Sequence, residues 1–152
     1  MRISTPLSLA LAMVAAAAVG FGMYKVLSRG SGNGVPAHGG LDIQVISRGE
    51  PVDLRDHLVP GKYTLFDYYA DWCPPCRELA PRLEELVRRQ PNLALRKIDI
   101  VDWTRPVADQ QGVHDLPYLR LYGPDGRLIQ EGDAAYAEVR RLFGFALPLP
   151  TL

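Results

Sequence analysis

The chain has 152 residues, of which 47% are hydrophobic and 22% are charged, so it is long enough for one globular domain and a short additional segment. Its 17 Lys and Arg residues balance its 17 Asp and Glu residues. A formal net charge of zero gives no support to a protein that binds nucleic acid by electrostatic attraction.

The chain begins with an apolar segment that carries no charged residue from Ile3 to Tyr24. Arg2 precedes this segment and Lys25 follows it. About 20 apolar residues span a bilayer as a helix, which favours an uncleaved membrane anchor within residues 1–28. A cleaved signal peptide is the alternative, because small alanines follow a short hydrophobic region. Both interpretations export the rest of the chain, although the flanking charges do not settle the orientation and leave a cytoplasmic domain as the minority interpretation.

Residues 29–40 (RGSGNGVPAHGG) are rich in glycine and show no periodic pattern, which predicts a flexible linker. The composition changes at Leu41, where a domain is predicted to begin and to extend over residues 41–143. Residues 144–152 form an apolar tail that is interrupted by two prolines. We expect this tail to pack loosely on the surface, and no role is assigned to it.

The hydrophobic pattern of the domain predicts strands and helices that alternate along the chain. Strands are expected at residues 42–46, 63–70, 93–100, 118–122 and 128–130. Helices are expected at residues 53–58, 77–89, 106–111 and 134–142. The last two strands flank the sequence Gly-Pro-Asp-Gly, which is a strong hairpin signal. This order predicts an α/β fold whose mixed sheet has parallel strands followed by an antiparallel hairpin.

The only two cysteines, Cys73 and Cys76, lie in the motif Trp-Cys-Pro-Pro-Cys between the second strand and the helix that follows it. The two prolines favour a turn that brings the two sulfur atoms together. A cysteine at the first turn of a helix has a lowered pKa, which makes Cys73 the candidate nucleophile. So short a loop gains little stability from a structural disulfide, and a tetrahedral zinc site needs more ligands. We therefore favour redox chemistry and expect neither a metal nor another cofactor.

Three features together resemble the thioredoxin family over about residues 41–143. They are the run Phe66–Arg77 (FDYYADWCPPCR), the helix proline Pro81 and the segment GVHDLP at residues 112–117. The motif WCPPC is also similar to that of tryparedoxins and nucleoredoxins, whose domains differ elsewhere. The resemblance implies the compact thioredoxin fold and thiol–disulfide oxidoreductase activity, and it is much less specific for the substrate.

The resemblance also implies roles for residues at the cysteine motif and below it. Cys73 would attack a substrate disulfide, and the more buried Cys76 would resolve the mixed disulfide, so that the two cysteines end as a redox disulfide. Asp67 would be a buried carboxyl with a raised pKa that takes the Cys76 proton through water. The alternative is an Asp67 that faces solvent on a half-exposed strand. Lys97 resembles the lysine that accompanies this acid in thioredoxins.

Further residues are expected beside the cysteines. Pro117 matches the cis-proline of the family, with an ordinary trans proline as the alternative. The backbone of Leu116 would then be free to pair with an extended substrate. Trp72 would be an exposed aromatic contact for that substrate. Asp71 and Arg77 either tune the cysteine pair electrostatically or belong only to the surface.

These expectations combine into an exported, membrane-tethered thiol–disulfide oxidoreductase that reduces protein disulfides. Its partners would be proteins with disulfides or thiols, a membrane thiol carrier as electron donor, and the membrane itself through the N-terminal segment. A disulfide oxidant or isomerase is one alternative, and a non-catalytic binding or assembly module is another. The coincidence of Asp67, Cys73, Cys76 and Pro117 argues against the module, because scaffolding does not require it.

Overall fold

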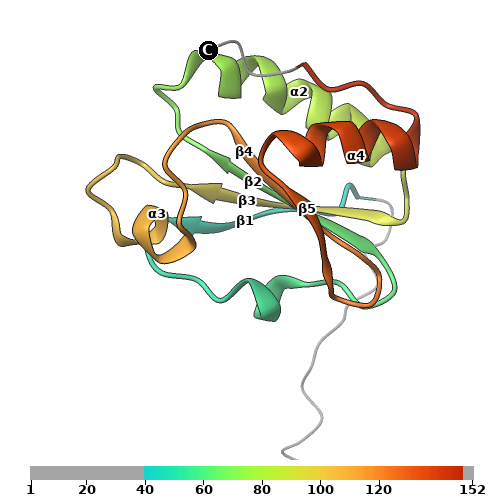
Figure 1. Ribbon diagram of the computed structural model, residues 1–152, viewed down its shortest axis with the longest axis horizontal. Coiled ribbons are helices and arrows are strands. Elements are labelled where there is room, and N and C mark those ends of the chain that lie inside the picture. The colour runs from blue at the N-terminus through green and yellow to red at the C-terminus, as the bar shows by residue number, and fades with distance from the viewer. Residues whose placement is uncertain (1–39, 149–152) are drawn as a thin grey trace, which may run out of the picture. The chain divides into compact units, whose positions relative to one another are not determined.

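A computed structural model describes residues 40–148 of the chain (Figure 1). The predictions for the N-terminal segment, for nearly all of the linker and for the last four residues of the tail lie outside the described residues. Among residues 40–148, no helix is long and apolar enough to cross a membrane.

Five strands form one mixed sheet in the order β1-β3-β2-β4-β5. Their bounds are β1 Ile43–Arg48, β2 Tyr63–Tyr69, β3 Leu93–Asp99, β4 Tyr118–Tyr122 and β5 Leu128–Glu131. Strand β3 runs parallel to both β1 and β2, whereas β4 is antiparallel to β2 and to β5. The predicted mixed sheet with its C-terminal hairpin is therefore confirmed, and β2 is its central strand.

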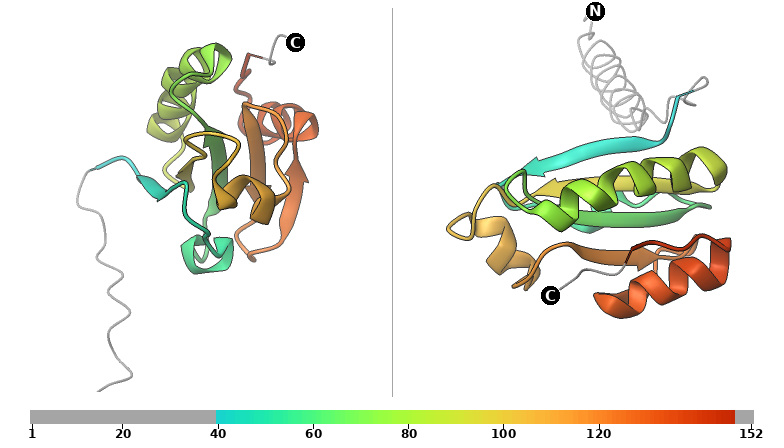
Figure 2. Two further views of the ribbon diagram at one scale, coloured as in Figure 1. Left: turned by 90° about the vertical axis from the view of Figure 1, so that its left-hand side faces the viewer. Right: turned by 90° about the horizontal axis from the view of Figure 1, so that it is seen from above.

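Helices cover both faces of the sheet (Figures 1 and 2). They are the 3-10 helix η1 Leu54–His57 and the α-helices α2 Pro74–Arg89, α3 Pro106–Gln111 and α4 Asp133–Phe143. Helices α2 and α4 lie on one face, and α3 and η1 lie on the other. Each face of the sheet therefore has its own hydrophobic core.

Strand β2 is buried on both faces, as expected of a central strand with helices above and below it. Its side chains alternate between the two cores. Leu65 packs under α2 and α4, whereas Phe66 and Tyr68 pack toward α3 and η1. The same alternation places Asp67 on the face covered by α2 and α4.

Helix α2 begins at Pro74, earlier than the predicted start at Arg77. Proline is favoured in the first turn of a helix, because the N–H group that it lacks has no partner inside the helix there. Cys73 is the N-cap residue of this helix. The Pro-Pro pair is thus the first turn of the helix and not a separate turn before it.

The tail packs more closely than the sequence predicted. Leu147 is only 8% exposed and belongs to the core formed with α2 and α4. The guanidinium of Arg89 lies 5.5 Å from the centre of the Phe145 ring. The expectation of loose packing is therefore wrong for this part of the tail, since its prolines prevent regular structure without preventing burial.

Candidate active site

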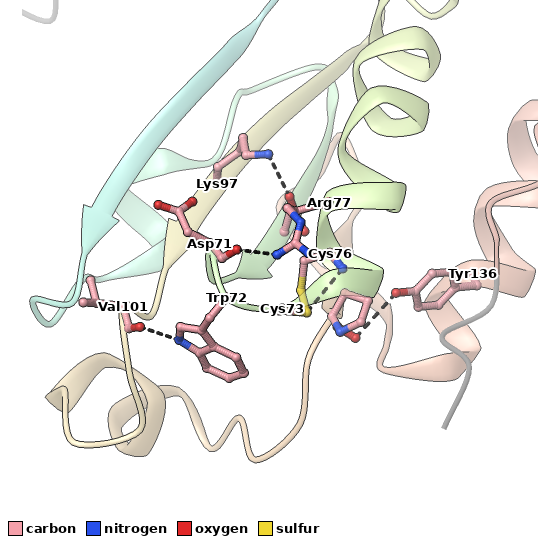
Figure 3. Close-up of a disulfide and its surroundings, with 10 residues drawn as sticks. Asp71, Trp72, Cys73, Cys76, Arg77, Lys97, Val101 and Tyr136 are labelled. Atoms are coloured by element: carbon pink, nitrogen blue, oxygen red, sulfur yellow. Dashed lines mark hydrogen bonds and ion pairs between the residues drawn. A yellow bond between two sulfur atoms is a disulfide. The ribbon is translucent and has the colours of Figure 1, made fainter.

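Cys73 and Cys76 form a disulfide at the start of α2 (Figure 3). Their sulfur atoms are 2.09 Å apart and their Cα atoms 5.3 Å apart. The central strand β2 ends at Tyr69, and the motif follows at its carboxyl end. In α/β proteins, reactive groups commonly lie at the carboxyl ends of the sheet strands. Cys73 is 3% exposed and Cys76 is 4% exposed, so the expected greater burial of Cys76 is not seen. The covalent bond holds both residues at a similar depth.

The first free N–H groups of α2 are directed at Cys73. Pro74 and Pro75 carry no N–H group, so the first helical residue that can donate is Cys76. Its N–H donates to Cys73 Sγ over 3.2 Å, and the N–H of Arg77 donates to the Cys73 carbonyl oxygen over 3.3 Å. In the reduced protein, the same helix terminus favours a negative charge on Cys73 Sγ.

Asp67 lies on β2 and is only 2% exposed, so the solvent-facing alternative is wrong. Lys97 stands opposite it on β3, and its Nζ is 3.2 Å from Asp67 Oδ2. Burial raises the pKa of Asp67, and the charge and hydrogen bond of Lys97 oppose that rise. The ammonium of Lys97 also lies 4.5 Å from the centre of the Tyr69 ring. The expected pairing of Lys97 with the buried acid is therefore found.

The peptide bond between Leu116 and Pro117 is cis, so the trans alternative is wrong. Leu116 packs against the core that contains both cysteines. The Pro117 carbonyl oxygen accepts a hydrogen bond of 3.5 Å from the hydroxyl of Tyr136, which is a buried residue of α4 (Figure 3). Burial raises the pKa of Tyr136, and the negative charge of Asp67 adds to that rise. From the sequence, Tyr136 was recognisable only as a residue on the apolar side of a helix.

Trp72 is 49% exposed beside the disulfide, as expected. Its indole N–H donates to the Val101 carbonyl oxygen over 2.6 Å (Figure 3). The Arg77 guanidinium donates to the Asp71 carbonyl oxygen over 2.8 Å. Arg77 therefore binds the backbone of Asp71, and not its carboxylate, in the loop that also carries Trp72.

A polar network near the cis-proline was not identified from the sequence. Arg120 on β4 donates to the Tyr68 hydroxyl and to Gln111 Oε1, in each case over 3.1 Å, and to the Gln111 carbonyl oxygen over 2.6 Å. It also pairs with Glu131 on β5 over 2.6 Å. The network connects both ends of the loop formed by residues 112–117 to the central strand. Its members are far apart in the sequence, so no local motif could have predicted it.

Within residues 40–148, no group of three or more His, Cys, Asp or Glu side chains is arranged to hold a metal ion. The chemistry that the described site can perform is thiol–disulfide exchange, because its reactive group is a disulfide at a helix N-terminus.

Comparisons with known proteins agree with this arrangement. The family model described as Thioredoxin matches residues 54–141, which is more than half of the chain. A thioredoxin of Chlamydia trachomatis is 35% identical over 88 residues, which cover 58% of this chain and 80% of the relative. Thioredoxin-2 of Pyricularia oryzae is 37% identical over 79 residues, which cover 52% of this chain and 45% of the relative. The chain therefore spans less than half the length of the fungal relative.

Among solved structures, the oxidised form of mitochondrial thioredoxin 3 from Saccharomyces cerevisiae superposes with a TM-score of 0.50. The two chains are 27% identical, and the match covers 64% of this chain and 95% of the yeast protein. The similarity therefore spans almost the whole of a thioredoxin in its oxidised state.

Proposed function

Because the chain belongs to the thioredoxin family, we propose that it reduces protein disulfides through Cys73 and Cys76. Thiol–disulfide oxidoreductase activity follows from the family and from the disulfide at the start of α2. The proposal adds the direction of electron flow and the kind of substrate. The observation that carries it is the buried Asp67, which lies on the strand leading to the motif and has a raised pKa.

The reaction proceeds by two thiol–disulfide exchanges. The Cys73 thiolate attacks one sulfur of a substrate disulfide, the substrate S–S bond breaks, and the other substrate sulfur leaves as a thiolate. Cys76, as a thiolate, then attacks Cys73 Sγ in the mixed disulfide and releases the second substrate thiolate. Two electrons pass to the substrate, and the protein ends with the Cys73–Cys76 disulfide.

Asp67 accepts the proton that Cys76 loses in the second exchange. A buried thiol needs a base before it can attack, and a carboxylate with a raised pKa is a stronger base than an exposed one. Burial of Asp67 and Cys76 supports this role, with a water molecule carrying the proton between them. The ammonium of Lys97 opposes the effect of burial on the pKa of Asp67 and so favours the carboxylate form that can accept the proton.

Leu116 and Pro117 position the substrate in this proposal. Pro117 has no N–H group, so its backbone nitrogen presents no proton to the sulfur atoms. Between residues 40 and 148, no backbone hydrogen bond to Leu116 occurs in the loops and turns, which supports pairing of its backbone with an extended substrate. Trp72 adds an exposed aromatic contact next to Cys73.

A trapping experiment tests the roles of the two cysteines, and the reduction potential tests the direction of the reaction. The Cys76→Ser variant should accumulate mixed disulfides with its substrates, because the second exchange is lost, whereas Cys73→Ser should form none. The reduction potential of the wild-type protein should lie near that of thioredoxin, about −270 mV. A value near the roughly −120 mV of a strong disulfide oxidant would contradict the reductase proposal and favour the oxidant.

We also propose that the domain works outside the cytoplasm, tethered by the apolar N-terminal segment. The support is the uncharged stretch from Ile3 to Tyr24 and the glycine-rich residues 29–40 that follow it. A reductase in an oxidising compartment needs an electron source, and a membrane thiol carrier would supply it by reducing the Cys73–Cys76 disulfide through the same exchange chemistry.

A further inference from the structure

Two tryptophans form an exposed aromatic surface beside the disulfide. Trp72 is 49% exposed and Trp103 is 43% exposed, and their ring centres are 6.0 Å apart with the planes tilted by 58°. Trp72 directly precedes Cys73, whereas Trp103 lies in the loop between β3 and α3. This tryptophan surface therefore begins at the reactive cysteine and extends to a separate loop.

Trp72 is held in place by Val101, a residue whose backbone conformation costs free energy. Val101 has a φ of 61°, in the left-handed region that a β-branched residue rarely adopts. Its carbonyl oxygen accepts the Trp72 indole N–H, as Figure 3 shows, and its own N–H donates to Asp99 Oδ1 over 2.8 Å. Trp72 has therefore used its one hydrogen-bond donor, and its exposed ring remains free for contact through its face and edge.

The charges around the tryptophan surface balance one another. Asp71 and Asp102 each directly precede one of the two tryptophans. Arg77 donates to the Asp71 carbonyl oxygen. Hydrogen bonds from Thr104 lower the pKa of the Asp102 carboxyl, and the positive charge of Arg105 in the same loop adds a smaller effect. Asp99, which accepts the Val101 N–H, and its cross-strand neighbour Arg48 add one charge of each sign. The formal charges around the surface therefore cancel, so that they favour neither a cation nor an anion. The side chain that gains most from contact with it is an apolar one.

We propose that Trp72 and Trp103 bind an apolar side chain, aromatic by preference, on the polypeptide segment that flanks the substrate cysteine. The inference rests on the proposed reduction of protein disulfides and adds a sequence preference to it. Aromatic rings pair favourably at centre distances of about 4.5–7 Å, and tryptophan is prominent among the residues that dominate binding energy at interfaces. Trp103 acts in docking only and takes no part in the exchange of thiols.

Matched substrates test this preference. Three disulfide-linked peptide dimers would be identical except for Phe, Lys or Ser next to the cysteine, and 2-hydroxyethyl disulfide would serve as a substrate without a peptide. The second-order rate constant is measured with the reduced full chain, by chromatography of the released thiol. We expect the Phe peptide to react about tenfold faster than the Ser peptide, and Trp103→Ala to remove that difference. The rate with 2-hydroxyethyl disulfide should change less than about twofold in this variant.

Two variants serve as controls. Trp103→Phe keeps a ring and should retain most of the preference. Leu128 is 45% exposed on β5, where it pairs with Tyr122 at the end of β4 that is farther from Pro117. Leu128→Ala should therefore leave all four rates unchanged. If Trp103→Ala folds poorly, Trp103→Gln removes the ring and keeps a long exposed side chain.

Other results would overturn the inference. Faster reaction of the Lys peptide would indicate recognition of a cation. Equal rates for the three peptides would show that the surface does not select. A loss in Trp103→Ala that is equally large with 2-hydroxyethyl disulfide would make Trp103 a structural residue. If the wild type reduced none of the four substrates, the proposed function itself would fail, which is a different outcome from reduction without preference.

Discussion

Asp67 and Asp42 are two acidic residues with cationic partners whose pKa values the fold shifts in opposite directions. Asp67 is enclosed under α2 and α4, and burial outweighs its single ion pair with Lys97, so its pKa is raised. Burial also acts on Asp42, but Arg96 at 2.9 Å and Lys62 at 3.1 Å together outweigh it and lower the pKa. The two residues therefore make opposite contributions to the pH dependence of stability.

Replacing Asp67 by Asn should stabilise the oxidised protein at neutral pH by about 1–3 kcal/mol, because a buried amide has no charge to desolvate. A raised pKa means that the folded protein binds this proton more strongly than the unfolded chain does. Wild-type stability therefore falls as the pH rises from the ordinary value of 3.8 through the folded pKa. Urea unfolding between pH 4 and pH 9 should show this decline in the wild type and a flatter profile in the variant. An equal decline in both proteins would assign it to another group.

Replacing Asp42 by Asn should have the opposite effect and lower the stability at neutral pH. The loss should be about 1 kcal/mol, because solvent reaches this carboxylate and screens its ion pairs. The lowered pKa means that the stabilisation is complete above 3.8 and is lost as the pH falls through the folded pKa. Urea unfolding at pH 7 and at pH 2 measures it. A variant that is as stable as the wild type at pH 7 would show that the contacts with Arg96 and Lys62 contribute nothing net.

At the scale of the elements, the chain after α4 is part of the core and can be tested as such. Leu147 is buried beside a cavity of about 160 Å³ that is lined by Tyr136, Ala137, Arg140, Ala146 and Leu147 itself. Leu147→Ala should enlarge this cavity and lower the free energy of unfolding by about 2–4 kcal/mol. Thermal unfolding followed by circular dichroism measures the change. Leu128→Ala, at an exposed site, should stay within about 0.5 kcal/mol of the wild type. Equal effects of the two variants would mean that the tail does not pack on α2 and α4.

Periodic patterns predicted the elements well, because alternation and helical spacing report which face of an element is buried. The bounds of α3 and β4 agree with the prediction, and the sheet is mixed with an antiparallel C-terminal hairpin, as the order of the elements predicted. The start of α2 was missed, since Pro74 and Pro75 suggested a turn where they occupy the first turn of the helix. The burial of Leu147 was missed because a short irregular segment has no period to detect.

The residues of the candidate site also fall into those that the sequence predicted and those that only the structure revealed. The family motif located Cys73, Cys76, Asp67 and Pro117, and their assigned roles stay predictions. The motif could not show which side chains from distant elements surround them, since a sequence pattern carries no information on contacts across the fold. Those residues are Val101, Trp103, Gln111, Arg120 and Tyr136.

At the scale of the whole molecule, the N-terminal segment bears on where in the cell the domain works. A dithiol can reduce disulfides repeatedly only if another thiol reduces it in turn. The apolar residues 3–24 would place the domain at a membrane, where a membrane thiol carrier can reach it. Location and electron supply are therefore two consequences of one proposal about the N-terminal segment.

Fractionation of cells that produce the full chain tests this proposal. An uncleaved anchor should keep the protein in the membrane fraction through alkaline carbonate and release it only with detergent, because about 20 apolar residues would span the bilayer. Replacing Leu11 and Val14 by Arg should shift the protein to the soluble fraction, since a charge at the centre of a spanning helix costs about 2.5–3.5 kcal/mol.

Labelling of the reduced cysteines by a membrane-impermeant maleimide in intact cells would place the domain outside. A soluble exported chain that lacks its first residues would instead show a cleaved signal peptide, and protection from the reagent would place the domain in the cytoplasm.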